Sequence, residues 1–208
     1  IQTIYFGGGT PSRIEPAAVG AIVAAIRADR LVAEHAEITL EANPDDVTPA
    51  AAAGWAEQGI NRVSLGVQSF HPAALEWMHR THGPEQPGIA IETLRRAGIR
   101  NVSVDLIYAL PEALGRDWKS DVERALALAP SHVSLYGLTV ETGTPLGKWV
   151  ARGAAEPMPD PAAEVEYLAA HEMLERGGYR HYEVSNAGLP GFESRHNQAY
   201  WSRATYLG

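Results

Sequence analysis

Short apolar runs alternate along the chain with longer segments in which apolar residues recur at helical spacing. Each short run predicts a strand, because it is rich in Val, Ile, Leu or Tyr and is bounded by Gly, Asn or Pro. In one longer segment, Val19, Ile22, Val23 and Ile26 fall at i, i+3, i+4 and i+7, which indicates one apolar helix face. The predicted strands are residues 1–6, 37–43, 62–68, 101–108 and 132–140.

Capping signals mark the ends of several predicted helices. Thr48 followed by Pro49 predicts a helix start, and Gly59 predicts the end of that helix. An Asp-Pro pair at 160–161 predicts a second start, before a helix that ends near residues 177–178. Strand–helix–strand units in this order predict an α/β fold with a parallel sheet. A barrel and a doubly wound sheet both fit this order, and both bind ligands at the carboxyl ends of their strands.

Each predicted strand ends in residues that can form hydrogen bonds. The first is followed by three glycines and Thr10, and the others end near Glu41, Gln68, Asp105 and Thr139. Taken singly, each has an ordinary structural explanation, such as a tight turn or a helix cap. Because the carboxyl ends of parallel strands meet at one edge of a sheet, the five together favour a site for a polar small molecule.

The glycines in YFGGGTPS, residues 5–12, allow backbone amides to approach a ligand with no Cβ between them. Neither GxxxxGK[ST] nor a complete dinucleotide fingerprint is present, which disfavours binding of nucleotide phosphates. A zwitterionic ligand fits better. The amides of residues 8–10, the Glu41 carboxylate, the Gln68 amide and the Arg80 guanidinium together suit its amine and carboxylate.

Composition narrows the classes of function. The chain has 208 residues, 45% of them apolar, which suits one large core, and its net charge of −8 disfavours a nucleic-acid surface. It has no apolar stretch long enough for a transmembrane segment and no signal peptide, so we expect a cytoplasmic protein. It has no cysteine, and it opens on Ile1 within a predicted strand, so we expect an internal piece of a longer protein.

Several segments together resemble the radical S-adenosylmethionine (SAM) proteins, and within them the oxygen-independent coproporphyrinogen III oxidases and related haem chaperones. The resemblance covers nearly the whole chain and implies a partial (β/α) barrel over residues 1–185 that lacks its first strand. Residues 186–208 then begin a C-terminal segment with the HNxxYW pattern, which is typical of the chaperones. The matching segments are YFGGGTPS, LEANPDDVT, GINRVSLGVQSF, RTH, NVSVDLIYALP, HVSLYGLTVETGTPL, YEVSN and SRHNQAYW.

The resemblance also implies a set of site residues. Gly8, Gly9 and Thr10 match the glycine motif that contacts the methionine portion of SAM. Further matches to polar positions of the SAM site are Glu41, Gln68, Arg80, Asp105 and Thr139. The family holds a 4Fe-4S cluster through CxxxCxxC, shortly before the strand that opens this chain. That motif is absent here, so this chain holds no cluster through cysteine and no metal ligand is predicted in it.

The HNQAYW segment opens on His196, which has two readings. Its imidazole could be an axial ligand of haem iron, with Tyr200 and Trp201 stacking on the macrocycle and Arg195 pairing with a propionate. Alternatively, the two aromatic residues close the barrel mouth, His196 caps a loop and Arg195 is a solvated loop residue. We treat His196 as a candidate haem-binding residue.

Two further features carry expectations. His79 and His82 flank Arg80 at a spacing that could place both on one helix face as a metal pair, but no third ligand lies nearby in sequence. Ala109 stands where the family usually has glycine, a change that is tolerable unless its φ is positive.

Three functions are compatible with these patterns. The favoured one, because of HNQAYW, is a haem chaperone that binds SAM and haem, has a 4Fe-4S cluster in the intact protein, and delivers haem to haem-accepting proteins. The alternative is an enzyme of porphyrin biosynthesis that oxidises coproporphyrinogen III with a 5′-deoxyadenosyl radical. The third is a barrel that binds another polar metabolite. The sequence leaves open whether SAM is cleaved.

Overall fold

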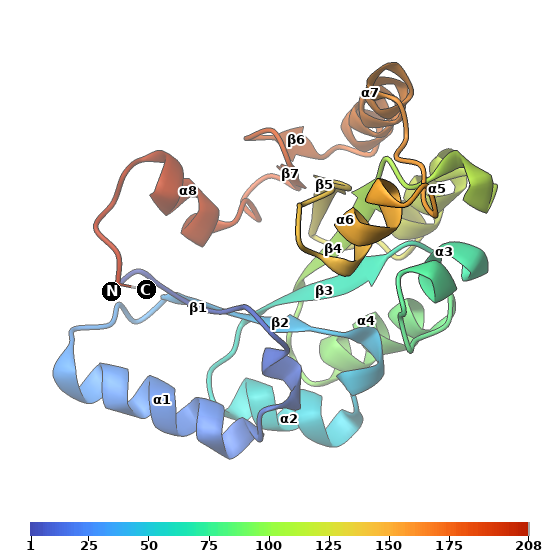
Figure 1. The fold of residues 1–208 in the computed structure, drawn as a ribbon. Helices are drawn as coiled ribbons and strands as arrows, with labels where there is room; N and C mark the ends of the chain where they lie inside the picture. Colours follow the sequence, from blue (N-terminus) through green and yellow to red (C-terminus); the bar gives the residue numbers. More distant parts are fainter. Residues whose placement is uncertain (208) are drawn as a thin grey trace.

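The computed structural model describes residues 1–207, which form a seven-stranded sheet covered by helices (Figure 1). The strand order is β1-β2-β3-β4-β5-β7-β6, and β1 to β5 pair in parallel. Two short strands continue the sheet antiparallel beyond β5. The strands are β1 (Thr3–Phe6), β2 (Glu37–Ala42), β3 (Arg62–Gln68), β4 (Asn101–Tyr108), β5 (His132–Gly137), β6 (Arg180–His181) and β7 (Asn186–Gly188).

All five predicted strands and their parallel arrangement are confirmed. The main difference in length is at β5, which ends at Gly137 rather than at residue 140. Residues 186–188 belong to the same sheet as the predicted barrel strands, because β7 pairs with β5.

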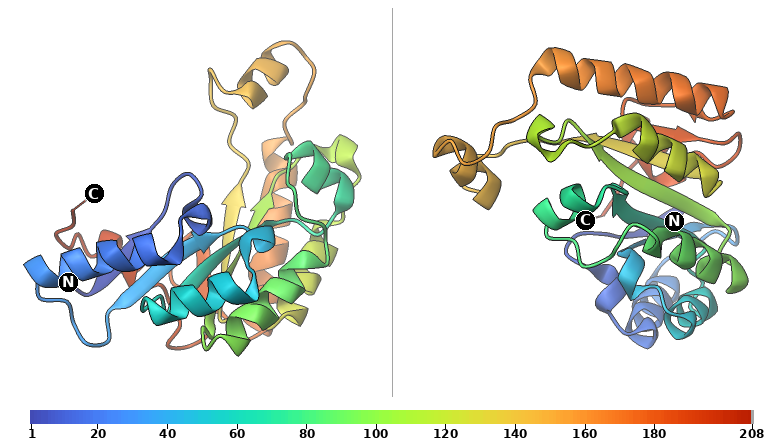
Figure 2. Two further views of the ribbon diagram at one scale, coloured as in Figure 1. Left: turned by 90° about the horizontal axis from the view of Figure 1, so that it is seen from below. Right: turned by 90° about the vertical axis from the view of Figure 1, so that its right-hand side faces the viewer.

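Helices fill the connections between the strands. Figure 1 shows α1, α2 and α4 on one side of the sheet, whereas α8 lies beside β1 on the other side. Figure 2 shows α6 on a loop that extends beyond the carboxyl end of β5. The α-helices are α1 (Pro16–Asp29), α2 (Pro49–Glu57), α3 (Pro72–Trp77), α4 (Gln86–Arg96), α5 (Trp118–Ala127), α6 (Pro145–Ala151), α7 (Asp160–Arg176) and α8 (Arg195–Trp201); the 3-10 helices are η1 (Pro11–Arg13), η2 (Pro44–Asp46) and η3 (Glu112–Leu114).

The two predicted helix starts match the structure to different degrees. The Thr48 hydroxyl accepts a hydrogen bond from the Ala51 amide at 3.1 Å, and α2 ends two residues before Gly59, as predicted. At α7, Asp160 is the first helical residue rather than the cap. Pro159 occupies the cap position there and has no side chain able to accept a hydrogen bond.

The two faces of the sheet differ in polarity. One face packs against the helices and forms the core, with Trp55 of α2 and Leu174 of α7 fully buried beneath it. The apolar strand residues of this face alternate with polar residues that point to the opposite face, as the two-residue period of a strand requires. The buried polar residues of that opposite face are Glu37, Thr39, Arg62, Ser64, Ser103, His132, Ser134 and Asn186. The sheet therefore carries an apolar core on one side and a polar interior on the other.

Candidate functional site

The glycine loop, Gly7–Gly9, follows β1 at its carboxyl end. Gly8 and Gly9 have φ values of +79° and +59°, a left-handed conformation that glycine adopts without a steric penalty. A Cβ on either would meet no atom within 4 Å, so the space above them is open. Gly7 differs, because its Cβ would lie 2.6 Å from Tyr5 Cε1 and 3.0 Å from Glu41 Oε1. The loop needs glycine for its conformation at two positions and for close packing at the third.

Glu41 fixes the loop to the sheet. One carboxylate oxygen accepts a hydrogen bond from the Gly8 amide at 3.0 Å, and the other accepts one from the Tyr5 hydroxyl at 2.8 Å. Burial, reinforced by the Glu41 charge, raises the pKa of Tyr5, so this phenol stays protonated and keeps donating. Each carboxylate oxygen has a second lone pair, so Glu41 can still accept hydrogen bonds from a ligand.

Gln68 is the last residue of β3, and Arg80 lies in the loop that follows α3. A register shift between Gly66 and Gln68 ends β3, and Gln68 has a φ of +67°. Its amide nitrogen lies 3.0 Å from where a Cβ on Gly66 would be. Arg80 donates to the Asn43 side-chain oxygen at 3.4 Å, the one hydrogen bond of its guanidinium within residues 1–207. Burial lowers the pKa of Arg80. Its remaining donors are available to a ligand carboxylate.

Asp105 lies within β4 on the polar face rather than at the end of the strand. Its carboxylate accepts hydrogen bonds from Ser64 at 2.8 and 3.0 Å and from Ser103 at 3.1 Å. Burial raises the pKa of Asp105, and hydrogen bonds from serines on β3, β4 and β5 oppose that shift. Its charge contributes to the raised pKa of Tyr5, so Asp105 and Glu41 act on one region of the polar face.

Two predicted residues make no side-chain hydrogen bond to the groups described above. Thr139 is exposed beyond the end of β5, and its hydroxyl donates to the Gly137 carbonyl at 3.4 Å. Thr10 is half-buried directly after the glycine loop, and its side chain makes no capping hydrogen bond to η1. The hydrogen bonds within residues 1–207 thus join Glu41 to the glycine loop and Arg80 to Asn43, whereas neither threonine side chain bonds to these groups.

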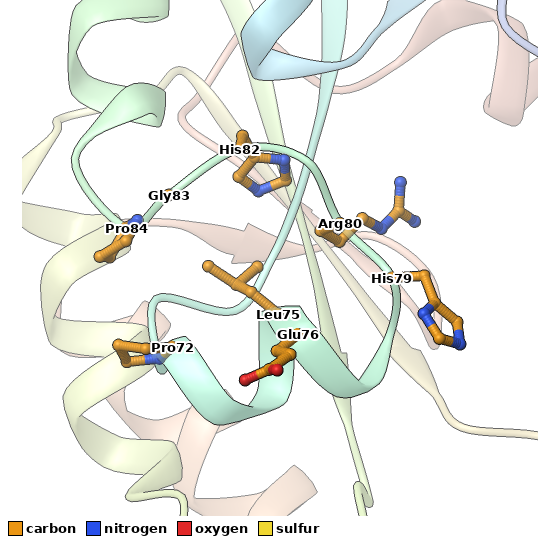
Figure 3. Close-up of a pocket in the computed structure, with 8 residues that line it drawn as sticks. All are labelled: Pro72, Leu75, Glu76, His79, Arg80, His82, Gly83 and Pro84. Atoms are coloured by element: carbon orange, nitrogen blue, oxygen red, sulfur yellow. The ribbon is translucent and has the colours of Figure 1, made fainter.

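A surface pocket of about 430 Å³ adjoins Arg80 (Figure 3). The segment after α3 forms one wall, and Figure 3 shows the rings of His79 and His82 pointing in different directions. The spacing that could have placed both histidines on one helix face does not do so, because α3 ends at Trp77 and both residues lie in the loop that follows. His82 is buried, with Nε2 3.1 Å from the Val67 carbonyl, and burial lowers its pKa. Across residues 1–207, no three His, Asp or Glu side chains are placed to hold a metal.

The HNQAYW segment forms α8, which docks on the starts of β1 and β2. The amides of Arg195 and His196 donate to the Glu37 carboxylate at 3.2 and 3.1 Å. The Arg195 guanidinium donates to the His35 carbonyl at 2.6 Å and to the Gln2 side chain at 3.0 Å. The helix is thus held to the sheet by charged hydrogen bonds at its first turn.

His196 is half-buried against the first strand. Its Nδ1 lies 2.8 Å from the Thr3 hydroxyl, and its ring stacks on Tyr5 with centroids 4.9 Å apart. Burial lowers the pKa of His196, which favours the neutral imidazole. Tyr200 and Trp201 are 51% and 67% exposed, so their rings do not plug the sheet interior.

Sequence reasoning missed a buried ion pair between the segment after η3 and helix α7. Arg116, whose side chain is 2% exposed, donates to both carboxylate oxygens of Glu166 at 2.9 and 2.7 Å. Glu166 also accepts from the Ala109 amide at 2.7 Å, which joins α7 to the end of β4. The partners are 50 residues apart, and no local motif connects them. Tyr5 was also missed, although it lies only two residues before the first of the glycines.

Most of the chain matches a known protein family. The sequence profile of the radical SAM superfamily matches residues 1–125. The chain belongs to the radical SAM superfamily. Its fold is similar to that of the radical SAM enzyme coproporphyrinogen III oxidase (HemN) from Escherichia coli, with a TM-score of 0.76 over 97% of this chain and 46% of that one. Their identity is 21%, so this likeness concerns the fold alone.

Curated radical SAM relatives match the whole chain. The heme chaperone HemW of Lactococcus lactis is 42% identical over 210 residues, 55% of that protein. HemW of Synechocystis is 39% identical, over 50% of its length. A mouse mitochondrial protein described as radical S-adenosyl methionine domain-containing protein 1 is 38% identical, over 47% of its length. The chain therefore spans about half the length of the curated relatives it matches.

Membership of the radical SAM superfamily implies SAM and a 4Fe-4S cluster. The residues of this chain fit SAM but not the cluster. The chain has no cysteine, and the described part of it has no other group able to hold a metal, so the cluster does not fit this chain. SAM fits the donor and acceptor set. Glu41 and Asp105 suit cationic or hydroxyl groups, Arg80 suits a carboxylate, and the space above Gly8 and Gly9 is open. No helix within residues 1–207 is long and apolar enough to cross a membrane.

Proposed function

We propose that this chain is the SAM-binding part of a cytoplasmic haem chaperone, which binds haem and transfers it to haem-accepting proteins. The observation that carries the proposal is the likeness of the whole chain to relatives described as heme chaperones, at 42% and 39% identity. The HNQAYW segment supports it, because its helix displays two exposed aromatic rings next to a histidine.

In this proposal the strand ends hold SAM. Arg80 pairs with the ligand carboxylate, and Glu41 accepts from its ammonium or from a ribose hydroxyl. The glycine loop lies against the methionine portion, because the open space above Gly8 and Gly9 lets a ligand approach the backbone. Gln68 and Asp105 complete the polar wall, while Thr10 and Thr139 lie at its margins. SAM supplies a methionine and an adenosyl group here, and the chain binds and orients them.

His196 is proposed to contact haem. Its Nδ1 is taken up by Thr3, so Nε2 is the ring nitrogen left for iron. The exposed rings of Tyr200 and Trp201 would stack on the macrocycle. Residues 186–208 then form the beginning of the haem-handling segment, and residues 1–185 form the cofactor-binding part.

The SAM assignment is tested with Glu41→Ala and Arg80→Ala. Both variants should weaken SAM binding in equilibrium dialysis by roughly tenfold or more, since each removes a charge-assisted hydrogen bond. Glu57→Ala and Arg27→Ala remove exposed side chains of the same charge on α2 and α1 and should bind like the unaltered protein. Equal affinity in all five proteins would remove Glu41 and Arg80 from the site.

The haem assignment is tested by titrating haemin into the protein and following the Soret band. His196→Ala should shift the band and lower the affinity, whereas Gln198→Ala, an exposed change on the same helix, should not. Haem-loaded protein should then pass haem to an apo-globin. An unaltered Soret spectrum in His196→Ala would return this histidine to a structural role. Multiple-turnover conversion of coproporphyrinogen III by the intact protein with its cluster reconstituted would instead make it an oxidase.

A further inference from the structure

A continuous set of contacts joins α8 to the glycine loop. The His196 ring stacks on Tyr5, Tyr5 donates to Glu41, and Glu41 accepts from Gly8. Three contacts thus connect Gly8 and His196, which are 188 positions apart in the sequence. We propose that His196 is a positioning residue for the glycine loop, acting through Tyr5 and Glu41, so that the HNQAYW helix and the loop are coupled.

The first step depends on how firmly His196 is held. Its amide donates to Glu37, its Nδ1 lies 2.8 Å from the Thr3 hydroxyl, and its ring makes a T-shaped contact with Tyr200 at a centroid distance of 5.1 Å. The ring is therefore fixed between Tyr200 and Tyr5. The planes of His196 and Tyr5 differ by 23°, so the imidazole supports the flat face of the phenol ring.

The second step runs through the Tyr5 hydroxyl. Tyr5 is the residue that brings Glu41 Oε1 to the base of the loop, and it also limits the space at Gly7, whose Cβ would lie 2.6 Å from Cε1. A tilt of the phenol ring therefore changes both the hydrogen bond to Glu41 and the packing of Gly7. With the imidazole removed, Tyr5 loses the surface that limits this tilt.

The third step is the anchor of the loop itself. The amide of Gly8 donates to Glu41 Oε2 at 3.0 Å, and Gly8 and Gly9 are otherwise exposed. Few other contacts limit the loop, so its conformation depends on where Glu41 lies. Any ligand that displaces α8 also displaces the loop, and by linkage a ligand on the loop affects the helix to the same degree.

The coupling is measured first in the ligand-free protein, from the exchange rate and chemical shift of the Gly8 amide by NMR. His196→Ala should speed exchange of this amide by about threefold to tenfold, the range that one aromatic contact supports. His196→Phe keeps a flat ring on Tyr5 and should restore the wild-type rate. Gln198→Ala should leave the rate unchanged. Gln198 is exposed, and it lies two residues after His196, so it points to the opposite side of α8.

The Tyr5→Phe variant tests whether His196 acts on the glycine loop through the Tyr5 hydroxyl or only by loosening the structure around it. It keeps the stacked ring but removes the hydroxyl that reaches Glu41. Within the Tyr5→Phe background, His196→Ala should cause no additional change at the Gly8 amide. Additive effects of the two substitutions would show that His196 does not act through this hydroxyl, and would overturn the inference.

The identity of the ligand as SAM rests on the proposed function, and a second readout tests it. SAM affinity in equilibrium dialysis should fall about threefold to tenfold in His196→Ala and recover in His196→Phe, although phenylalanine offers no nitrogen to haem iron. If His196→Ala leaves the exchange rate of the Gly8 amide unchanged, the coupling is overturned, whatever the effect on SAM affinity. A responsive amide in a protein that does not bind SAM contradicts the proposed function and leaves the coupling standing.

Discussion

Replacing Ala109 by glycine should stabilise this protein. Ala109 follows β4 with a φ of +59°, in the left-handed region that disfavours every residue with a Cβ. Its amide donates to Glu166 at 2.7 Å, and the carboxylate of Glu166 is held in turn by Arg116. The buried ion pair therefore keeps Ala109 in a conformation that its own side chain opposes.

The magnitude follows from two opposing contributions. A non-glycine residue in the left-handed region costs roughly 1–2 kcal/mol, which glycine removes. Glycine also gives the unfolded chain more conformational freedom, which destabilises the folded state by about 0.4–1 kcal/mol. The hydrogen bond to Glu166 is made by the backbone and survives the change. The net expectation is a gain of roughly 0.5–1 kcal/mol in the free energy of unfolding, or about 1–4 °C in Tm for a chain of this size.

Urea unfolding of the two proteins, followed by circular dichroism, measures this difference. Ala53→Gly is the matched control, because Ala53 is exposed within α2 and the same replacement there should cost about 1 kcal/mol. The two alanine-to-glycine changes should thus have opposite signs. If Ala109→Gly destabilises the protein like Ala53→Gly, the left-handed conformation at Ala109 is refuted.

Two further predictions concern the buried charges and histidines. Glu166→Ala removes the bidentate partner of buried Arg116 and leaves it only Asp121, at 3.6 Å, so it should cost roughly 2–3 kcal/mol in urea unfolding. Glu92→Ala, at an exposed pair with Arg96, should cost under about 0.5 kcal/mol; equal costs would contradict the burial of the Arg116–Glu166 pair. Burial lowers the pKa of His132 well below 6.5, so the unfolded chain binds the proton more readily and stability should fall as the pH drops below that value. His132→Gln should flatten this decline, measured as unfolding free energy at about pH 7.5 and about pH 5.5; an unchanged slope would show that His132 titrates normally.

The sequence predicts the local features of the fold well. The five parallel strands follow from their apolar runs, and the start of α2 follows from the Thr48 hydroxyl, because each depends on neighbours in the chain. The predicted start of α7 is one residue too late. Asp160-Pro161 has the sequence of a cap followed by the first helical residue, but Pro159, with its extended backbone, occupies the cap position and Asp160 is already helical.

Features that depend on distant partners could not be predicted. Asp105 resembles a strand-end ligand in the sequence, but serines on β3 and β4 surround its carboxylate within the sheet. The sign of φ at Ala109 depends on Glu166, 57 residues away. The contact between His196 and Tyr5 requires α8 to return to the first strand. In each case the deciding contact joins segments whose proximity only the complete fold creates.

The central claim is that SAM binds at the glycine loop and its neighbouring strand ends. NMR of the uniformly ¹⁵N-labelled protein during a SAM titration tests it most directly. If SAM binds there, the Gly8 and Gly9 amides and the Arg80 side chain should show saturable shifts, and Glu41→Ala should abolish them. A second pocket of about 400 Å³, lined in part by Leu110, Met158 and Val165, offers a distinct location. Shifts confined to that pocket, or no saturable shifts at all, would contradict the account.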